Sequence, residues 1–474
     1  MATTLRPPRT APDLPIHLDP KLRNQGSRVS AALRAAIIDG LLRPGTRLPS
    51  SRSLADQLGV RRNAVVVAYE HLMSDGLVEA RHGSGTFVAT ALPVREDQAA
   101  AVGRDFTPAQ RRPFALGHTL SDPALLRRLA RAVRRHIASA GEEELGYGDP
   151  RGSERLRSEI AKHLAAHRGV RSDPSCILIV HGTQHGLRLC VEALLSPGDA
   201  VWVEDPGYYA ARNTLETAGL RPVPVPVDDQ GLIVAAGRKT GRKAKAVYVT
   251  PSHQFPTGVT MSMPRRVALL EWARATGAWI LEDDYDSEFR YAGPPLTALA
   301  GIGGEQVIYL GTFTKTLFAG LRIAYAVLPP NVIERVVTIR AGHDRFPQRF
   351  MQDAVADLMH DGTLAAHIRR MRLRYREARD TAAEAIARAA GDSLRLTVPS
   401  QGLHLLAELP PGIPTSLARD ILAAADVDAR LLSDNRISQS APEGFILGFS
   451  GHGLDELRAA GRRLGKAARS ALRI

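Results

Sequence analysis

The segment Gly311–Arg322, GTFTKTLFAGLR, sets a single lysine among small and hydroxylated residues. Three threonines offer hydroxyl groups beside the Lys315 amine, and Arg322 can hold a doubly charged anion. A lysine that loses its charge through burial becomes a nucleophile toward carbonyl carbons. The segment therefore predicts an attachment site for a phosphorylated aldehyde. Taken alone, the segment is more simply interpreted as a surface loop that contains a lysine. The role of Lys315 therefore has to be judged from the rest of the chain.

The chain is long enough for at least two domains, with 474 residues and 44% hydrophobic content. It has no run of about 18 apolar residues, which excludes a transmembrane helix and a membrane partner. The N-terminal stretch MATTLRPPRTAPDLP has no apolar core and does not resemble a secretory signal. These features predict a cytoplasmic protein.

The overall charge is strongly basic, with a formal net charge of +13. Such a charge suits a polyanionic partner, but it also suits an arginine-rich, solvated surface, and composition alone leaves both open. The two cysteines, Cys176 and Cys190, lie in apolar runs without metal-ligand spacing. They are expected to be reduced and packed, and no metal site is predicted.

Residues 16–90 show the pattern of a small DNA-binding domain. Apolar residues recur at helical spacing over Ser27–Gly40, a second helix can begin at Ser50 or Ser51, and a third begins at about Arg62. The stretch LVEARHGSGTFVA then predicts a β-hairpin with a glycine-rich turn. Three helices followed by a hairpin make a winged helix-turn-helix.

The third helix opens with Arg61, Arg62 and Asn63, which can reach phosphates and base edges in a major groove, or simply solvate a small domain. The strings GTRLPSSRSLADQLGVRRNAVVVAYEHL and DGLVEARHGSGTFV are similar over their full length to the DNA-binding domain of GntR-family bacterial regulators. The resemblance implies operator DNA as a partner. It assigns operator contacts to Arg52, Arg62 and Asn63, and wing contacts to His82 and Gly83.

Residues 91–113 are rich in Ala, Gln, Arg and Pro and lack apolar periodicity. Structureless loops of about 20 residues are uncommon inside compact domains. This stretch is therefore expected to be a flexible linker between two domains.

Residues 114–474 alternate helical patterns with short β-branched runs, as an α/β domain does. Five runs are expected to be strands: CILIVHG, AVWVED, AVYVTPS, AWILEDD and QVIYLGT. Parallel strands bring functional groups together at their carboxyl ends. The polar residues that follow these runs are therefore expected to form one site.

Each strand end supplies a group that a phosphorylated pyridine aldehyde would need. Thr183 and Gln184 precede a helix whose N-terminus can hold a phosphate. Tyr208 can stack on a flat ring, and an aspartate of DDYDSEFR can pair with a protonated pyridine nitrogen. Each signal is weak alone. Their order along the chain, ending at Lys315, predicts pyridoxal phosphate as the cofactor.

The strings GYGDPRG, EDPGY, TPSHQFPTGVTMS, EDDYDSEFRY and YLGTFTKTLFAGLR resemble fold-type I pyridoxal-phosphate enzymes of the aspartate aminotransferase class. Joined to a GntR-type domain, the chain is similar to the MocR subfamily of regulators from about Leu22 to Leu464. The resemblance implies a mixed, mostly parallel sheet flanked by helices, preceded by a small α+β winged helix. It also implies a homodimer, in which the DNA-binding domains can be exchanged between subunits.

The resemblance also implies a role for each site residue. Lys315 would attach the cofactor through a Schiff base, Asp283 would bind the pyridine nitrogen, and Tyr285 would bind the phenolic oxygen. Tyr208 would stack on the ring. The phosphate would be held by Thr183, Gln184, Thr314 and Arg322, with Tyr147 reaching over from a partner subunit.

Two departures from the enzyme pattern bear on function. Phe255 replaces the asparagine that would bind the phenolic oxygen, and Ile446 stands where aminotransferases carry the arginine that binds the substrate carboxylate. Arg430 or Arg436 could replace that arginine, and the sequence does not decide between them. The expected effector is accordingly pyridoxal phosphate itself, or an amine or amino acid that reacts with it.

The sequence thus predicts a transcriptional regulator that binds DNA, depends on pyridoxal phosphate and senses a small molecule, with any aminotransferase chemistry residual. The alternative is a genuine aminotransferase whose DNA-binding domain is vestigial. Sustained turnover with an amino donor and a keto acceptor, without specific DNA binding, would favour the alternative.

Overall fold

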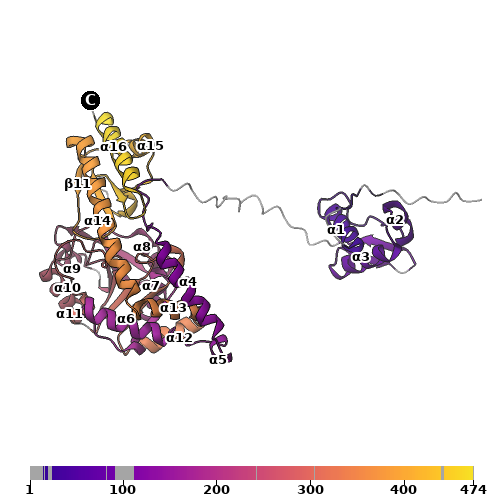
Figure 1. Ribbon diagram of the computed structural model, residues 1–474, viewed down its shortest axis with the longest axis horizontal. Coiled ribbons are helices and arrows are strands. Elements are labelled where there is room, and N and C mark those ends of the chain that lie inside the picture. The colour runs from indigo at the N-terminus through magenta and orange to yellow at the C-terminus, as the bar shows by residue number, and fades with distance from the viewer. Residues whose placement is uncertain are drawn as a thin grey trace, which may run out of the picture. The chain divides into compact units, whose positions relative to one another are not determined.

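The computed structural model describes residues 14, 16–19, 24–81, 83–90, 112–241, 243–303, 305–438 and 442–472. The chain divides into two compact units, residues 1–107 and 108–474, which are drawn in Figure 1. The linker expected over residues 91–113 lies outside the described residues except for its last two. Within the described ranges, no helix has the length and apolar character needed to cross a bilayer.

The small unit contains the expected three helices and hairpin. Ser50 begins the second helix by accepting a hydrogen bond from the Ser53 amide at 3.2 Å, and Gly59 ends it in a left-handed conformation. Val29, Leu54 and Leu72 are fully buried between the helices. The elements are α1 (Gln25–Ile38), α2 (Ser51–Leu58), α3 (Arg62–Ser74), β1 (Val78–Arg81) and β2 (Gly85–Val88). This arrangement confirms the winged helix-turn-helix.

The large unit is built on an eight-stranded sheet in the order β3-β10-β9-β8-β7-β4-β5-β6. The strands β4, β5, β7, β8 and β9 are parallel to one another, whereas β10 is antiparallel to both of its neighbours. The bounds are β3 (Ile177–Val180), β4 (Ala200–Asp205), β5 (Arg221–Asp228), β6 (Gly231–Leu232), β7 (Ala244–Val249), β8 (Trp279–Asp284), β9 (Val307–Thr312) and β10 (Ala324–Val327). All five predicted strands are present.

Helices cover both faces of this sheet, which explains why its strands read as nearly continuous apolar runs. On β4, Val201 and Val203 face one side, whereas Trp202 faces the other and stacks on Trp272 at 4.0 Å between ring centroids. The helices are α4 (Pro123–Ala138), α5 (Glu142–Leu145), α6 (Glu154–His167), α7 (Thr183–Leu194), α8 (Tyr209–Thr217), α9 (Val234–Lys239), α10 (Met263–Thr276), α11 (Leu299–Ile302), α12 (Ile333–His343) and α13 (Arg349–His360).

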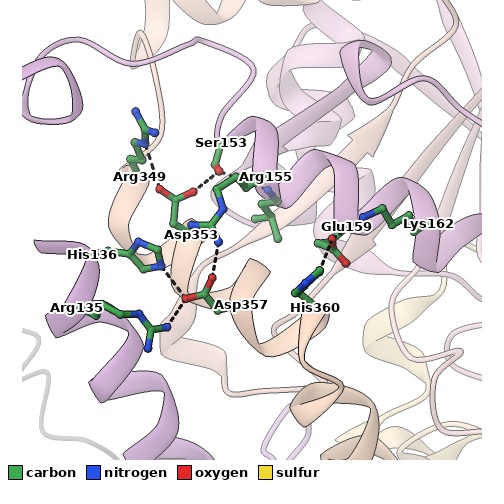
Figure 2. Close-up of polar contacts among 11 residues, drawn as sticks. Arg135, His136, Ser153, Arg155, Glu159, Lys162, Arg349, Asp353, Asp357 and His360 are labelled. Atoms are coloured by element: carbon green, nitrogen blue, oxygen red, sulfur yellow. Dashed lines mark hydrogen bonds and ion pairs between the residues drawn. The ribbon is translucent and has the colours of Figure 1, made fainter. Parts of the chain in front are cut away.

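A polar cluster joins three of these helices (Figure 2). The Asp357 carboxylate of α13 accepts hydrogen bonds from Arg135 and His136 of α4 and from Arg155 of α6, at 2.6 to 2.8 Å. Burial alone would raise the pKa of Asp357, but these hydrogen bonds outweigh burial and hold its pKa below the usual value. The cluster ties α4, α6 and α13 to one another.

The C-terminal part adds a long helix and a second sheet. Figure 1 shows α14 (Thr363–Ala390, orange) running beside α16 (Leu454–Ala471, yellow). They pack over an antiparallel sheet in the order β11-β12-β14-β13. The remaining bounds are β11 (Arg395–Thr397), β12 (His404–Glu408), α15 (Thr415–Ala425), β13 (Arg430–Leu431) and β14 (Gly444–Gly448). The first residues of β12 and β13 reach the carboxyl edge of the large sheet, where they help to line a pocket.

Candidate functional site

A pocket of about 300 Å³ lies where the strands β3, β4, β7, β8 and β9 end. Parallel strands that end at one edge of a sheet bring distant parts of the sequence together there. The lining includes eight of the nine residues predicted for cofactor binding: Thr183, Gln184, Tyr208, Asp283, Tyr285, Thr314, Lys315 and Arg322. Tyr147, the ninth, is 81% exposed and lies outside the lining, against the ring of Phe346.

Lys315 sits just beyond the end of β9, in the loop that leads to β10. Burial lowers the pKa of its amine, while the nearby carboxylates of Asp286 and Asp283 oppose that change. The lowered pKa increases the fraction of neutral amine at physiological pH. Lys315 is thereby suited to attack a carbonyl carbon.

Asp283 lies at the end of β8 and is only 4% exposed. Its Oδ2 accepts a hydrogen bond from the Tyr248 hydroxyl at 2.6 Å, and its Oδ1 has no partner in the described part of the chain. Burial raises the pKa of Asp283 to about 7. A buried carboxylate oxygen without a partner is costly, so Asp283 is poised for a cationic partner such as a protonated ring nitrogen.

The opposite end of the pocket is suited to an anion. Helix α7 begins at Thr183, so its first amide groups face the pocket with the positive end of the helix dipole. Gly182 has a φ of 107°, and a Cβ placed there would come within 3.2 Å of the Arg322 guanidinium. Arg322 therefore reaches the helix N-terminus, where it donates to the His181 carbonyl at 2.6 Å. Together these groups can hold a phosphate dianion.

The walls between these two ends are aromatic. The rings of Tyr208 and Phe255 lie 5.5 Å apart edge to face, and those of Phe255 and His404 lie 5.3 Å apart. Tyr285 completes this part of the lining. Phe255 thus fills space where an asparagine would have offered an amide donor. The pocket between the charged ends is shaped for a flat ring.

The structure distinguishes between the two arginines that could replace the missing carboxylate-binding arginine. Arg430, the first residue of β13, lines the pocket, and its guanidinium lies 4.9 Å from the ring of Tyr209. Arg436 lies outside the lining and donates to the Pro442 carbonyl at 3.1 Å. Ile446 pairs with Arg430 across the two strands and is fully buried. Of the two, only Arg430 can meet a ligand in this pocket.

In the small unit, the residues predicted to contact DNA gather on the surface. Arg61, Arg62 and Asn63 are exposed at the start of α3, and Arg52 is exposed on α2. Arg62 donates to the Ser51 hydroxyl at 3.3 Å, which steadies it between the two helices. Gly83 lies in the exposed turn between β1 and β2. His82 lies outside the described residues.

Sequence reasoning missed several residues of the pocket and of its supporting shell. Tyr248 lies within the apolar run AVYVTPS, which packing explains. His253 and Asp286 lie close in sequence to residues with clearer predicted roles. The signal that could have found them is polarity inside strings otherwise explained by packing. His404 carried no comparable signal, because it comes from the second sheet.

Two family models match the chain. Residues 25–88 match the bacterial regulatory proteins of the gntR family, and residues 116–434 match the class I and II aminotransferases.

The chain is also similar over its length to curated regulators. It is 35% identical to the probable rhizopine catabolism regulatory protein MocR of Rhizobium meliloti, over 90% of this chain and 92% of that protein. It is 32% identical to the pyridoxine biosynthesis transcriptional regulator PdxR of Corynebacterium glutamicum, over 94% and 96%.

Solved aminotransferases share the fold of the large unit. The kynurenine aminotransferase of Pyrococcus horikoshii superposes with a TM-score of 0.72 at 27% identity, covering 82% of this chain and 98% of that one. The α-aminoadipate aminotransferase LysN of Thermus thermophilus superposes with a TM-score of 0.69 at 28% identity, covering 76% and 93%. The latter was solved with a phosphopyridoxyl-leucine adduct.

Proposed function

The chain belongs to the MocR-type transcriptional regulators, in which a GntR-family winged helix precedes a class I and II aminotransferase domain, and from this membership we propose that its pocket is a sensor. The chain is a DNA-binding regulator whose aminotransferase-like domain implies pyridoxal phosphate as cofactor. The proposed signal is pyridoxal phosphate itself, or an amine or amino acid that reacts with it. The observation that carries the proposal is Lys315 facing Asp283 in one pocket of a chain that also carries a winged helix.

The pocket fits this cofactor at each of its reactive groups. The orphaned Oδ1 of Asp283 matches a protonated pyridine nitrogen, and the lowered pKa of Lys315 matches an aldehyde. The α7 N-terminus with Arg322 matches a phosphate dianion. The phosphate would bind at one end of the pocket and the protonated ring nitrogen at the other, so such a molecule would bind in a single orientation.

Bound pyridoxal phosphate supplies an aldehyde that condenses reversibly with amines and a ring that withdraws electrons. In our proposal Lys315 attaches it, Asp283 holds its ring nitrogen protonated, and Tyr208 and Phe255 exclude water from its faces. Its phosphate is held by Thr183, Gln184, Thr314 and Arg322. Lys315, when not attached to the cofactor, would bring a free amine to the loop after β9, and this would change the charge and the contacts there.

For the effector we propose an amino compound that also carries an anionic group. Arg430 is an exposed cation in the pocket lining, whereas Arg436 lies outside the lining and donates to the Pro442 carbonyl. Arg430→Ala should therefore weaken the binding of amino-acid effectors about tenfold or more, because a charge-assisted hydrogen bond contributes roughly 1.5–3 kcal/mol. The matched control is Arg436→Ala. A thermal-shift titration with a panel of amino acids compares them, and an effect confined to Arg436→Ala would contradict the assignment.

On the DNA side we propose that α3 enters the major groove with Arg62 and Asn63, and that Arg52 and Arg61 bind phosphates. The wing around His82 and Gly83 would meet the minor groove or the backbone. Because its target is bacterial operator DNA, the protein would act in the cytoplasm.

A homodimer is the proposed assembly. Tyr147 is exposed and would complete the phosphate site of a partner subunit. Helix α4 exposes apolar residues, among them Leu126 and Ile137, over a groove of about 600 Å³ that Met351 also lines. An exposed apolar patch of this kind fits a second copy of the chain. Analytical ultracentrifugation at several concentrations would test the dimer, and a monomer throughout would contradict it.

Signalling requires that the ligand bind one arrangement of the protein better than another, because only differential affinity shifts an equilibrium. The experiment that tests the regulator against a genuine aminotransferase has two arms. Footprinting upstream of the protein's own gene should show a specific protected site. Steady-state assays with amino donors and keto acceptors should show no sustained turnover. Sustained turnover without a specific footprint would favour the enzyme.

A further inference from the structure

Next to Tyr285, and outside the residues that line the pocket, lies a buried histidine and carboxylate pair. The side chains of His253 and Asp286 are 0% and 1% exposed, and Nδ1 of His253 lies 2.9 Å from Oδ2 of Asp286. The same Nδ1 lies 3.1 Å from the Tyr285 hydroxyl oxygen. One ring nitrogen therefore contacts both a carboxylate and a phenol that faces the pocket.

The position of the proton on His253 follows from this geometry. A carboxylate oxygen has only lone pairs to offer, so Nδ1 must carry the hydrogen that points at Asp286. An unprotonated Nδ1 would set two lone pairs against each other in a buried place. With its hydrogen on Nδ1, His253 cannot accept a hydrogen bond from Tyr285 there. The Nδ1 hydrogen is then shared between the Asp286 and Tyr285 oxygens as a three-centre hydrogen bond, so the Tyr285 oxygen accepts and its own hydrogen is free to point into the pocket.

Packing keeps this orientation fixed. A Cβ on Gly402, which has a φ of 89°, would lie 1.9 Å from Cε1 of His253, so the loop before β12 closes directly over the imidazole. The ring of His404 lies 4.8 Å away, with its Nε2 at 3.1 Å from the Pro256 carbonyl. The Nε2 of His253 is buried without a partner in the described part of the chain. Within the described ranges, His253 makes hydrogen bonds through its Nδ1 side alone.

We propose that His253 and Asp286 are a positioning pair that keeps the Tyr285 hydroxyl turned into the pocket as a hydrogen-bond donor to the ring oxygen of the cofactor. This inference rests on the proposed cofactor site and adds a role for two residues behind it. Phe255 offers no donor at this side of the pocket, so the orientation of Tyr285 decides whether the ring oxygen is hydrogen-bonded. Among the described residues, the other charged or titratable groups that act on this region include Asp283, Asp284, Glu204, Lys315, His404 and Arg430.

The substitution Asp286→Asn tests the pair because it keeps the size and reverses the hydrogen bond. The new amide donates to Nδ1, and the imidazole then carries its hydrogen on Nε2. The Tyr285 hydroxyl is then drawn to donate to Nδ1 of His253 and no longer donates into the pocket. The readout is the pH midpoint at which the visible absorption changes in the full-length protein loaded with pyridoxal phosphate.

A hydrogen bond from Tyr285 stabilises the anionic form of the ring oxygen. It therefore favours loss of the proton that this oxygen would share with the Lys315 nitrogen. Loss of the hydrogen bond should raise the midpoint by about one pH unit, the shift that ~1.4 kcal/mol produces. Tyr285→Phe should give the same rise. Loss of the Asp286 charge alone would act in the opposite direction, because a carboxylate near Lys315 favours a cation there.

Two further variants guard against general effects. Glu288→Gln removes another carboxylate of the same segment, one that is 21% exposed, pairs with His163 at 2.7 Å and lies outside the pocket lining, and it should leave the midpoint in place. His253→Asn keeps an amide donor near the Nδ1 position and should stay close to wild type, whereas His253→Leu should raise the midpoint as Asp286→Asn does. The two His253 variants suffice if the Asp286 variant does not fold.

The double variant Asp286→Asn with Tyr285→Phe should shift the midpoint no further than either change alone, because both remove one hydrogen bond. A midpoint that falls or stays in Asp286→Asn, or shifts that add in the double variant, would overturn the positioning role. A Tyr285→Phe protein that keeps the wild-type midpoint would overturn the proposed place of Tyr285 itself. The two failures are therefore distinguishable.

Discussion

The two units of this chain use charge in opposite ways. In the winged helix, Arg61, Arg62 and Asn63 stand exposed at the start of α3, where each can contact a long polyanion. In the aminotransferase-like unit, Asp283 and Lys315 are drawn into a pocket that shifts the pKa of both. Recognition of DNA needs solvated charges that keep their ionisation, whereas reversible bonding to an aldehyde needs groups whose ionisation has been changed by burial. A substitution at one site should therefore leave the other site's own binding unaffected when that binding is measured without the first site's ligand.

The largest expected effect is that of Lys315→Ala. It should abolish the visible absorption of bound pyridoxal phosphate and any response to amines, because Lys315 is the only lysine among the described residues that line the pocket. Operator affinity measured without pyridoxal phosphate should stay within about twofold of cofactor-free wild type, since a factor of ten requires 1.4 kcal/mol. Absorption spectra and gel shifts measure the two properties. Lost DNA binding with a retained response would show that the two ends have been wrongly assigned.

The next effect concerns Asp283→Asn and pH. Burial raises the pKa of Asp283 to about 7, so the folded protein without cofactor holds a proton that the unfolded chain releases near its ordinary value of 3.8. Wild-type stability should therefore fall as pH rises from about 4 to about 7, by a few kcal/mol. Asparagine cannot ionise, so the variant should escape this loss.

Denaturant unfolding of the cofactor-free proteins at pH 5 and pH 8 tests this. The variant should exceed wild type at pH 8 but not at pH 5, and it should bind pyridoxal phosphate more weakly. An equal difference at both pH values would contradict the buried, protonated carboxyl.

Arg62→Ala is expected to weaken operator binding by roughly 1–3 kcal/mol, the contribution of one good contact to a base edge. The control is Arg34→Ala, an exposed arginine that pairs with Asp75 just beyond the other end of α3. Cofactor absorption should be unchanged in both variants. Equal losses of DNA binding would mean that only general charge, and not the start of α3, contacts the operator.

The smallest effect is that of Ser50→Ala, which removes the hydrogen bond that caps α2. Such a cap contributes ~1 kcal/mol. In calorimetry, the unfolding of the small unit should shift to lower temperature while that of the cofactor-bearing unit stays in place. A shift of both transitions would show that the two units unfold together.

Much of this site was predictable, because buried parallel strands have a simple sequence signature and each is followed by a polar group. The runs ending before Thr183, Tyr208 and Lys315 placed these residues at one sheet edge without any knowledge of the fold. The caps at Ser50 and Gly59 were equally local. Local patterns succeed where a residue's neighbours in sequence determine its conformation.

Long-range pairing was not predictable. Whether Arg430 or Arg436 reaches the pocket depends on the pairing of β13 with β14 and on the contact of Arg436 with Pro442, and neither has a local signal. Likewise, the link between His253 and Asp286 joins loops 33 residues apart in sequence. Residues such as His253 and Asp286 come from separate loops and were missed. Residues that directly follow the predicted strands, such as Thr183 and Lys315, were found.

The central claim is that the pocket and the winged helix are coupled, and reciprocity tests it most directly. The dissociation constant of pyridoxal phosphate should be measured for the full-length protein with and without saturating operator DNA, and that of the operator with and without pyridoxal phosphate. Coupling predicts that both constants change by the same factor, about fivefold or more. If neither constant changes, the cofactor-binding domain and the DNA-binding domain are not coupled, and the central claim is contradicted.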